Sequence, residues 1–222
     1  MEARDLHHVI AIDGPAASGK SSVARELARR LNFVYVNSGA MYRAVTWVVL
    51  EQGIDPNDKN AIAKFIAGSR LGGELVDGEF HLLINKVDLT PHLNEHRVNA
   101  EVSRVSTVPE VRKLLVQRMR EYATERNLVI EGRDIGSVVF PDTPYKFYID
   151  ASPEIRAQRR AAQGLRDEIA QRDRADSSRA ASPLIISKDA EVIDTSNLSV
   201  DAVIGEVLKR LKRKGFQHLA IQ

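Results

Sequence analysis

Residues 9–22 read VIAIDGPAASGKSS, a short apolar run followed at once by the pattern G-x-x-x-x-G-K-S. Val23, Leu27 and Leu31 then recur at helical spacing. A strand, a glycine-rich loop and a helix in this order are the context in which the pattern forms a phosphate-binding loop. A plain link between strand and helix is the alternative, and the complete pattern in this context argues against it. We therefore predict a phosphate-binding loop after the first strand.

Each part of this loop has a chemical task. Its backbone N–H groups and the start of the following helix attract an anion. Gly14 and Gly19 permit turns and close approaches that a Cβ would block. Lys20 can reach the β- and γ-phosphates, and the Ser21 hydroxyl can hold Mg²⁺. Many proteins share the loop, so it does not define the reaction. The residues expected to line the nucleotide are Gly14, Pro15, Ala16, Ala17, Ser18, Gly19, Lys20, Ser21 and Ser22.

The composition is that of a soluble globular protein. The 222 residues, 43% of them hydrophobic, are enough for one sizeable core with an inserted subdomain. The net charge of +2 is too small to indicate a nucleic-acid surface. The absence of cysteine excludes disulfides and Cys-ligated zinc. The sequence shows no signal-peptide pattern and no apolar run that could span a bilayer, so we expect a cytoplasmic protein.

Strand-like runs alternate with helical patterns along the chain, which predicts a parallel sheet covered by helices on both faces. Later strands are expected at residues 33–36, 128–130, 146–150 and 191–194. Helices are expected to begin near Ala40 and at Pro109, Pro153 and Val200. In the helix from Pro109, Arg112 lies off the apolar stripe.

Residues 53–106 interrupt this alternation. Two strand-like runs flank Asp77 and Gly78, a strong signal for a hairpin. We therefore predict an inserted subdomain that contains a small antiparallel sheet. The predicted division of the chain is a core at residues 1–52, 107–161 and 179–222, an insertion at 53–106 and a lid at 162–178.

Charged residues follow two of the expected strands. Arg43 falls in the first turn of the helix near Ala40, where it is either solvated or held to meet an anion. Arg133 and Asp134 follow the strand at 128–130, and ligands of open α/β sheets bind outside the carboxyl ends of the strands. After the strand at 128–130, the alternative is a tight turn capped by Asp134. We favour a site for an anionic substrate there.

The predicted lid is dominated by charged residues. Arg172, Asp176 and Arg179 share one face of this segment if it is helical. Few apolar residues hold the segment in place, which is typical of a lid that opens and closes.

The basic residues indicate phosphoryl transfer, which depends on positioning and charge neutralisation more than on covalent chemistry. Lys20, Arg43, Arg133 and Arg179 would supply positive charge for an acceptor phosphate and for the moving γ-phosphoryl group. No general base is needed if the acceptor is an ionised phosphate. We therefore predict a small kinase with Lys20, Arg133 and Arg179 as its catalytic residues.

Four stretches of the chain resemble those of bacterial cytidylate kinases. The sequences SGAMYR and GRDIGSVVFPD are far more specific than the phosphate loop, and the four stretches are spread over nearly the whole chain. They lie at residues 12–22, 37–43, 131–142 and 172–184. The resemblance implies a P-loop NTPase-type α/β fold with an inserted monophosphate-binding subdomain and an Arg-rich lid.

The resemblance also implies an activity, the transfer of the γ-phosphoryl group from Mg²⁺·ATP to CMP or dCMP by a monomer that binds neither nucleic acid nor membrane. Around the acceptor nucleotide it places Ser38, Tyr42, Ser103, Arg112 and Asp134. It implies that the acceptor 5′-phosphate is held by Arg43 and Arg133, the ribose by Arg172 and Asp176, and the phosphates, on closure, by Arg179. It implies that ATP is flanked by Arg156 or Arg160.

Other functions remain open at this point. The nearest alternative is a kinase for another nucleoside monophosphate or for a small hydroxylated metabolite. A non-enzymatic nucleotide switch is a further alternative, since residues 85–88 read NKVD, the letters of a guanine-reading motif. These letters lie in the expected hairpin insertion and not after a core strand, which argues against a switch. A nucleic-acid-binding protein is disfavoured by the nearly balanced charge.

Overall fold

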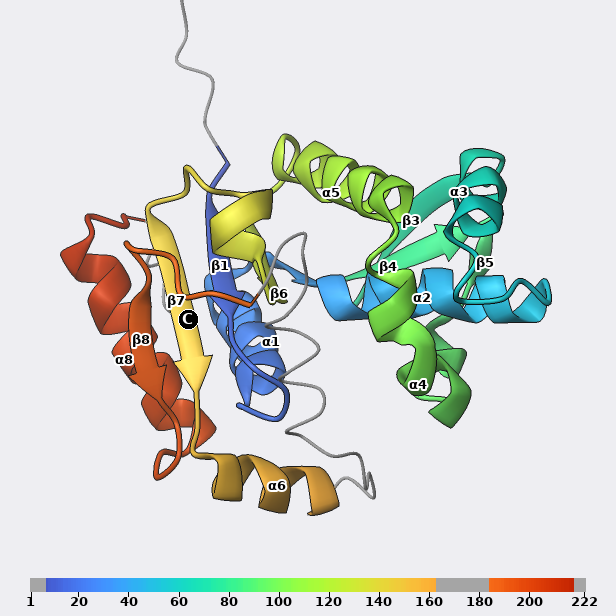
Figure 1. Cartoon of the computed structure of the whole chain (residues 1–222). Helices are drawn as coiled ribbons and strands as arrows, with labels where there is room; N and C mark the ends of the chain where they lie inside the picture. Colours follow the sequence, from blue (N-terminus) through green and yellow to red (C-terminus); the bar gives the residue numbers. More distant parts are fainter. Residues whose placement is uncertain (1–6, 163–183, 218–222) are drawn as a thin grey trace, which may run out of the picture. The chain divides into compact units, whose positions relative to one another are not determined.

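The computed structural model describes residues 7–162 and 184–217. The chain divides into two compact units (Figure 1). The first unit comprises residues 1–35 and 123–222, and the second unit is Val36–Tyr122. The predicted insertion at residues 53–106 lies within the second unit, and the predicted lid lies almost entirely outside the described residues.

The first unit is built on a sheet in the order β2-β6-β1-β7-β8, in which β2 runs on into the second unit. β1 pairs in parallel with β6 and β7, and β7 pairs in parallel with β8. This confirms the predicted parallel α/β sheet. The chain order reverses at β1, so a crevice for a ligand is expected at its carboxyl end. The strands are β1 (Val9–Asp13), β2 (Val34–Asn37), β6 (Leu128–Gly132), β7 (Tyr145–Asp150) and β8 (Glu191–Asp194).

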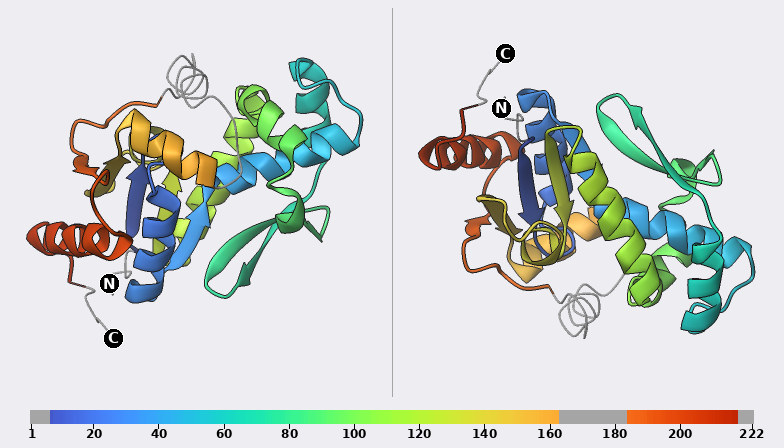
Figure 2. Two further views of the ribbon diagram at one scale, coloured as in Figure 1. Left: turned by 90° about the horizontal axis from the view of Figure 1, so that it is seen from below. Right: turned by 90° about the horizontal axis from the view of Figure 1, so that it is seen from above.

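The two faces of this sheet have different neighbours because side chains alternate along a strand. Ile10 and Ile12 of β1 belong to the apolar core formed with α1 (Lys20–Leu31) and α8 (Val200–Arg213). Asp13 and Lys146 point to the opposite face, toward the single π-helical turn η2 (Ile135–Val139). Figure 2 shows α1 and α8 on one side of the sheet and η2 on the other.

The beginnings of three helices confirm the predicted signals. Pro109 is the first residue of α5 (Pro109–Ala123) and Pro153 the first of α6 (Pro153–Ala162). The Ser152 hydroxyl accepts a hydrogen bond from the Ile155 N–H at 3.3 Å, as an N-cap does. At the start of α8, the Ser199 side chain accepts one from the Ala202 N–H at 3.2 Å.

The second unit contains the predicted hairpin, whose strands meet at Asp77 and Gly78. Both turn residues have positive φ, 49° and 80°, which a two-residue hairpin turn of type I′ requires. Residues 85–88 form the next turn and β5, so the letters NKVD do not follow a core strand. The elements are α2 (Ser38–Glu51), α3 (Lys59–Ala67), β3 (Leu71–Val76), β4 (Glu79–Ile84), β5 (Val87–Asp88), η1 (Thr90–His92), α4 (His96–Val105) and α5.

The start of α2 corrects the sequence-based prediction. We expected a turn at residues 37–39 and a helix from about Ala40, whereas α2 begins at Ser38. The cause is Asn37, whose side-chain oxygen accepts a hydrogen bond from the Ala40 N–H at 2.9 Å and so caps the helix. Arg43 therefore lies in the second turn, away from the free N–H groups of the helix start.

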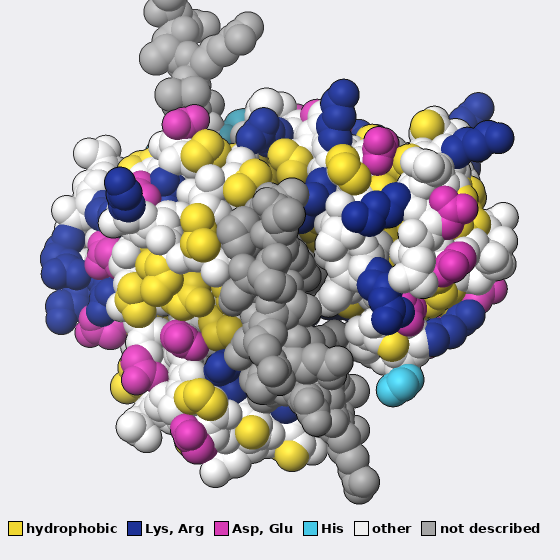
Figure 3. All heavy atoms as spheres, viewed as in Figure 1, with side chains coloured by type: hydrophobic (Ala, Val, Ile, Leu, Met, Phe, Trp, Pro, Cys, Tyr) yellow, Lys and Arg dark blue, Asp and Glu magenta, His cyan; other side chains and the backbone are white. Residues whose placement is uncertain are grey.

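The surface carries charges of both signs. On the face shown in Figure 3, basic and acidic side chains are interspersed. This mixture agrees with the small net charge of +2. Within residues 7–162 and 184–217, no helix is both long and apolar enough to cross a membrane.

Candidate active site

The predicted phosphate loop connects β1 to α1 at the carboxyl end of the central strand. Gly14 opens it at φ 153°, and Gly19 precedes the helix at φ 91°. A Cβ on Gly14 would lie 2.0 Å from the backbone oxygen of Ile149 in β7. No other residue fits there without moving a strand, which explains the glycine.

Lys20, the first residue of α1, lies over the loop. Its Nζ donates a hydrogen bond to the Pro15 carbonyl at 3.0 Å and lies 3.8 Å from Glu131 Oε2. The residue is only 6% exposed. A buried ammonium group beside backbone N–H groups is well suited to bind the phosphates of a nucleotide.

Glu131 completes this arrangement, although we did not select it from the sequence as a site residue. Its Oε1 accepts hydrogen bonds from the Ser21 hydroxyl at 2.7 Å and the Tyr35 hydroxyl at 3.2 Å. It is 3% exposed and lies on β6, beside β1. The signal that could have revealed it is its position: strand alternation places it with Val129, on the sheet face that α1 covers.

Ser21 and Glu131 provide the kind of oxygen ligands that Mg²⁺ prefers. In P-loop enzymes the metal is held by the loop hydroxyl and by a carboxylate on a neighbouring strand. The 2.7 Å hydrogen bond between these two side chains shows that their oxygen atoms lie close together beside the loop. The two residues are therefore suited to bind such an ion together. Among the residues that the structure describes, no group of three or more His, Asp or Glu side chains could hold a metal.

Arg133 and Asp134 follow β6 directly, as predicted. Asp134 is 6% exposed, and its carbonyl accepts hydrogen bonds from the N–H groups of Val138 and Val139 in η2. Asp13, at the end of β1, lies beside them. Burial raises the pKa of the Asp13 carboxyl to about 6, partly offset by hydrogen bonds from the N–H groups of Gly136 and Ile135. The nearby Asp134 also raises this pKa, and Arg133 lowers it.

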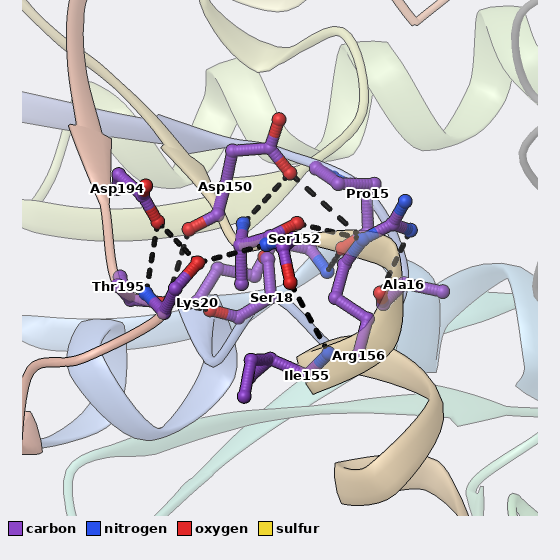
Figure 4. A network of polar contacts seen from close by, with 12 residues as sticks. Pro15, Ala16, Ser18, Lys20, Asp150, Ser152, Ile155, Arg156, Asp194 and Thr195 are labelled. Carbon is purple, nitrogen blue, oxygen red and sulfur yellow. Dashed lines mark hydrogen bonds and ion pairs between the residues drawn. The ribbon is translucent and has the colours of Figure 1, made fainter.

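Arg156, predicted beside ATP, binds the backbone around the loop (Figure 4). Its guanidinium group donates to the Ala151 carbonyl at 3.1 Å and to the Ala16 carbonyl at 3.5 Å, and Nε lies 3.9 Å from Asp150 Oδ1. The residue is buried. Arg156 therefore supports the loop through the backbone carbonyl group of Ala16. Arg160, which is partly buried, follows one turn later in α6.

A second support for the loop was not predicted. Thr195, just after β8, donates its hydroxyl hydrogen to the Ser18 carbonyl at 2.8 Å, with the Asp150 carbonyl at 3.0 Å as a second acceptor. Arg159 of α6 donates to the same Ser18 carbonyl at 3.2 Å and to the Thr195 carbonyl at 2.8 Å. The loop is thus held in place by residues that lie 141 and 177 positions after Ser18 in the sequence.

The second unit carries the other predicted acceptor residues. Ser38, Tyr42 and Arg43 lie on α2, Ser103 on α4 and Arg112 on α5. The Arg112 guanidinium lies 5.7 Å from the centre of the Tyr42 ring.

Arg112 differs from its prediction in one respect. We placed it off the apolar stripe of its helix, but it is 7% exposed and lies among the buried residues of α5. The cation–π contact with Tyr42 helps to offset the cost of burying this cation. The remaining predicted residues, Arg172, Asp176 and Arg179, lie outside the described residues.

A lysine over a phosphate loop, with a loop serine hydrogen-bonded to a carboxylate on a neighbouring parallel strand, is the arrangement of P-loop nucleotide-binding proteins. The sequence model described as cytidylate kinase matches residues 10–213, and the chain belongs to the cytidylate kinase family. It is therefore an enzyme that transfers phosphoryl groups and binds nucleotides.

Individual relatives agree with this assignment. A bifunctional pantoate ligase/cytidylate kinase from Synechococcus elongatus is 41% identical over 223 residues, covering 93% of this chain and 42% of that protein. A cytidylate kinase from Clostridium botulinum is 40% identical over 219 residues, covering 94% of this chain and 99% of that protein. The chain thus spans less than half the length of the bifunctional relative and nearly all of the clostridial one.

A solved structure also resembles the chain. The crystal structure of an uncharacterized protein from Eubacterium ventriosum superposes with a TM-score of 0.50, covering 93% of this chain and 99% of that chain. The two sequences are 16% identical, so this likeness concerns the fold alone.

Proposed function

We propose that the chain transfers the γ-phosphoryl group of ATP to CMP or dCMP, giving ADP and CDP or dCDP. The observation that carries the proposal is the hydrogen bond between Ser21 and Glu131 beneath Lys20, at the carboxyl ends of β1 and β6. Membership of the cytidylate kinase family supports the choice of acceptor.

The donor side of the reaction follows from the first unit. The loop N–H groups and Lys20 bind the ATP phosphates, and Ser21 and Glu131 would hold the Mg²⁺ that accompanies them. When bound, such an ion would supply positive charge that neutralises the phosphates. Arg133 contributes positive charge toward the group in transfer. An acceptor phosphate is already ionised at neutral pH, so the chain needs no general base.

The proposed acceptor side follows from the family resemblance. Cytosine offers an amine donor beside a ring nitrogen and a carbonyl acceptor, and Asp134, with Ser103 and Arg112, can meet both polarities. Uracil would leave such groups unpaired and would be rejected. The further roles we propose are Ser38 and Tyr42 beside the nucleotide, Arg43 and Arg133 on its phosphate, Arg172 and Asp176 on the ribose, Arg179 on the phosphates, and Arg156 or Arg160 beside ATP.

A coupled assay of ADP release tests the proposal, with Mg²⁺·ATP against CMP, dCMP, UMP, AMP, GMP and dTMP. We expect turnover with CMP and dCMP, its loss in Lys20→Ala, and a raised KM for CMP in Asp134→Ala. Strong turnover with another acceptor would keep the donor site and discard the roles of Ser103, Arg112 and Asp134. An unchanged ratio of CMP to UMP use in Asp134→Ala would overturn the role of that residue.

We further propose that the enzyme acts as a cytoplasmic monomer without nucleic acid. The mixed surface charge supports the last point. Sedimentation of the purified chain tests the monomeric state, and a second, concentration-dependent boundary would contradict it.

A further inference from the structure

Asp13 is a buried carboxylate that makes two hydrogen bonds to backbone. Oδ1 accepts from the Ile135 N–H at 2.8 Å, and Oδ2 accepts from the Gly136 N–H at 2.7 Å. The residue is 5% exposed and ends β1. Each oxygen therefore holds a different N–H group at the start of η2.

These bonds join two parts of the site that lie far apart in the sequence. Asp13 is followed directly by Gly14, the first residue of the phosphate loop. Ile135 is preceded directly by Arg133 and Asp134. The paired register of β1 and β6 ends at Asp13 and Gly132, so beyond this point the side chain of Asp13 continues the connection.

The environment explains why the bonds are well defined. The stem of Lys146 packs so closely on Gly136 that a Cβ there would lie 3.1 Å from Lys146 Cδ. Lys146 Nζ donates to the Pro141 carbonyl at 2.5 Å and pairs with Asp189 at 2.6 Å. The turn is thus fixed between Asp13 on one side and Lys146 on the other.

Keeping a carboxylate in this place is costly. A buried charge loses its hydration, and hydrogen bonds recover only part of that loss. A neutral side chain could cap the turn at lower cost, but an amide offers a single acceptor oxygen. The carboxylate holds two N–H groups at once and so leaves the turn little freedom to rotate.

We propose that Asp13 is a positioning residue for phosphoryl transfer, which sets the spacing between the phosphate loop and the turn that carries Arg133 and Asp134. The inference rests on the proposed function. Transfer requires the reacting groups to meet within a narrow range of distance and angle, and a displacement of about 1 Å can cost on the order of 100-fold in rate.

The test is Asp13→Asn, which keeps the size of the side chain and replaces one acceptor by an amide donor that faces an N–H group. We expect kcat with CMP to fall about 10- to 100-fold. The KM for Mg²⁺·ATP should stay within about threefold, because the loop keeps its other supports from Thr195, Arg156 and Arg159. Hydrogen exchange at the Ile135 and Gly136 amides should become faster than in the wild type.

Val207→Ala is the matched control. Val207 is fully buried in α8, on the other face of the sheet, so its loss lowers stability without touching the turn. This variant should unfold at a lower temperature with kcat and KM unchanged. If Asp13→Asn does not fold, Asp13→Ser, whose shorter side chain keeps at most one of the two bonds, takes its place.

The outcomes separate the two proposals. Wild-type turnover of CMP with an unchanged kcat in the Asp13 variant would overturn the positioning role alone. Equal loss of kcat in the Asp13 and Val207 variants would do the same, because it would show a general effect of instability. A wild type without turnover of any nucleoside monophosphate would overturn the proposed function, and the positioning role with it.

Discussion

At the scale of single residues, the site depends on buried charges held by a few directed bonds. Glu131 is the clearest case, since one carboxylate receives hydrogen bonds from Ser21 and Tyr35 and lies beside Lys20. A buried carboxylate needs such partners to offset its lost hydration. The same charge can then help to hold a divalent cation next to the loop.

Glu131→Gln tests this role. The variant keeps an acceptor for Ser21 but loses the negative charge, so we expect the Mg²⁺ concentration for half-maximal activity to rise about 10- to 100-fold. Initial rates over a Mg²⁺ titration at fixed ATP measure it. Glu26→Gln is the control, because Glu26 lies on α1 but pairs with Arg29 and Arg30. An identical Mg²⁺ dependence in Glu131→Gln and the wild type would rule out the metal role.

At the scale of elements, local signals were read correctly from the sequence. The hairpin at Asp77 and Gly78 and the helix starts at Pro109 and Pro153 depend on residues within a few positions of one another. The start of α2 was missed by two residues because the capping side chain of Asn37 was not recognised.

Contacts between distant elements could not be predicted in this way. Glu131 meets Ser21 across 110 positions, and Thr195 supports Ser18 across 177. No periodicity connects such positions, because their meeting depends on the strand order of the finished sheet. The sequence therefore indicates the phosphate loop and the basic residues, but not the distant side chains, such as Glu131 and Thr195, that form hydrogen bonds to the loop.

The hairpin of the second unit offers a prediction at this scale. A Cβ on Gly73 in β3 would lie 2.0 Å from the Tyr122 hydroxyl and 2.2 Å from Phe80 Cε2. The Phe80 and Tyr122 rings pack with centroids 4.0 Å apart, so they have to move to accept it. We expect Gly73→Ala to lower the free energy of unfolding by about 1 to 3 kcal/mol.

Gly72→Ala provides the matched control in the same strand. A Cβ on Gly72 would meet Leu83 Cβ at 3.7 Å, an ordinary contact. The urea concentration at the midpoint of unfolding should therefore equal or exceed that of the wild type. Urea denaturation followed by tryptophan fluorescence compares the two, since Trp47 lies on α2 of the same unit. Equal midpoints for both variants would show that the rings accept the methyl group without strain.

At the scale of the whole molecule, the pKa of Asp13 connects the site to stability. The value rises from 3.8 to about 6 mainly because of burial, and Asp134, Arg133 and the backbone N–H groups modify it. Since the folded-state pKa lies above the unfolded one, the folded state binds this proton more tightly. The resulting stabilisation is fully present below pH 3.8 and is lost as the pH rises through about 6.

This dependence can be isolated by comparison with Asp13→Asn, whose amide stays neutral at every pH. Subtracting the variant's free energy of unfolding from that of the wild type removes most contributions of other carboxylates. This difference should be about 3 kcal/mol more favourable to the wild type below pH 4 than at pH 7, which is the free-energy equivalent of the rise in pKa. Urea unfolding at a series of pH values measures it. If the difference does not change with pH, the Asp13 carboxyl has its ordinary pKa in the folded state. If the wild type instead loses stability relative to the variant as the pH falls, folding favours the charged form of Asp13.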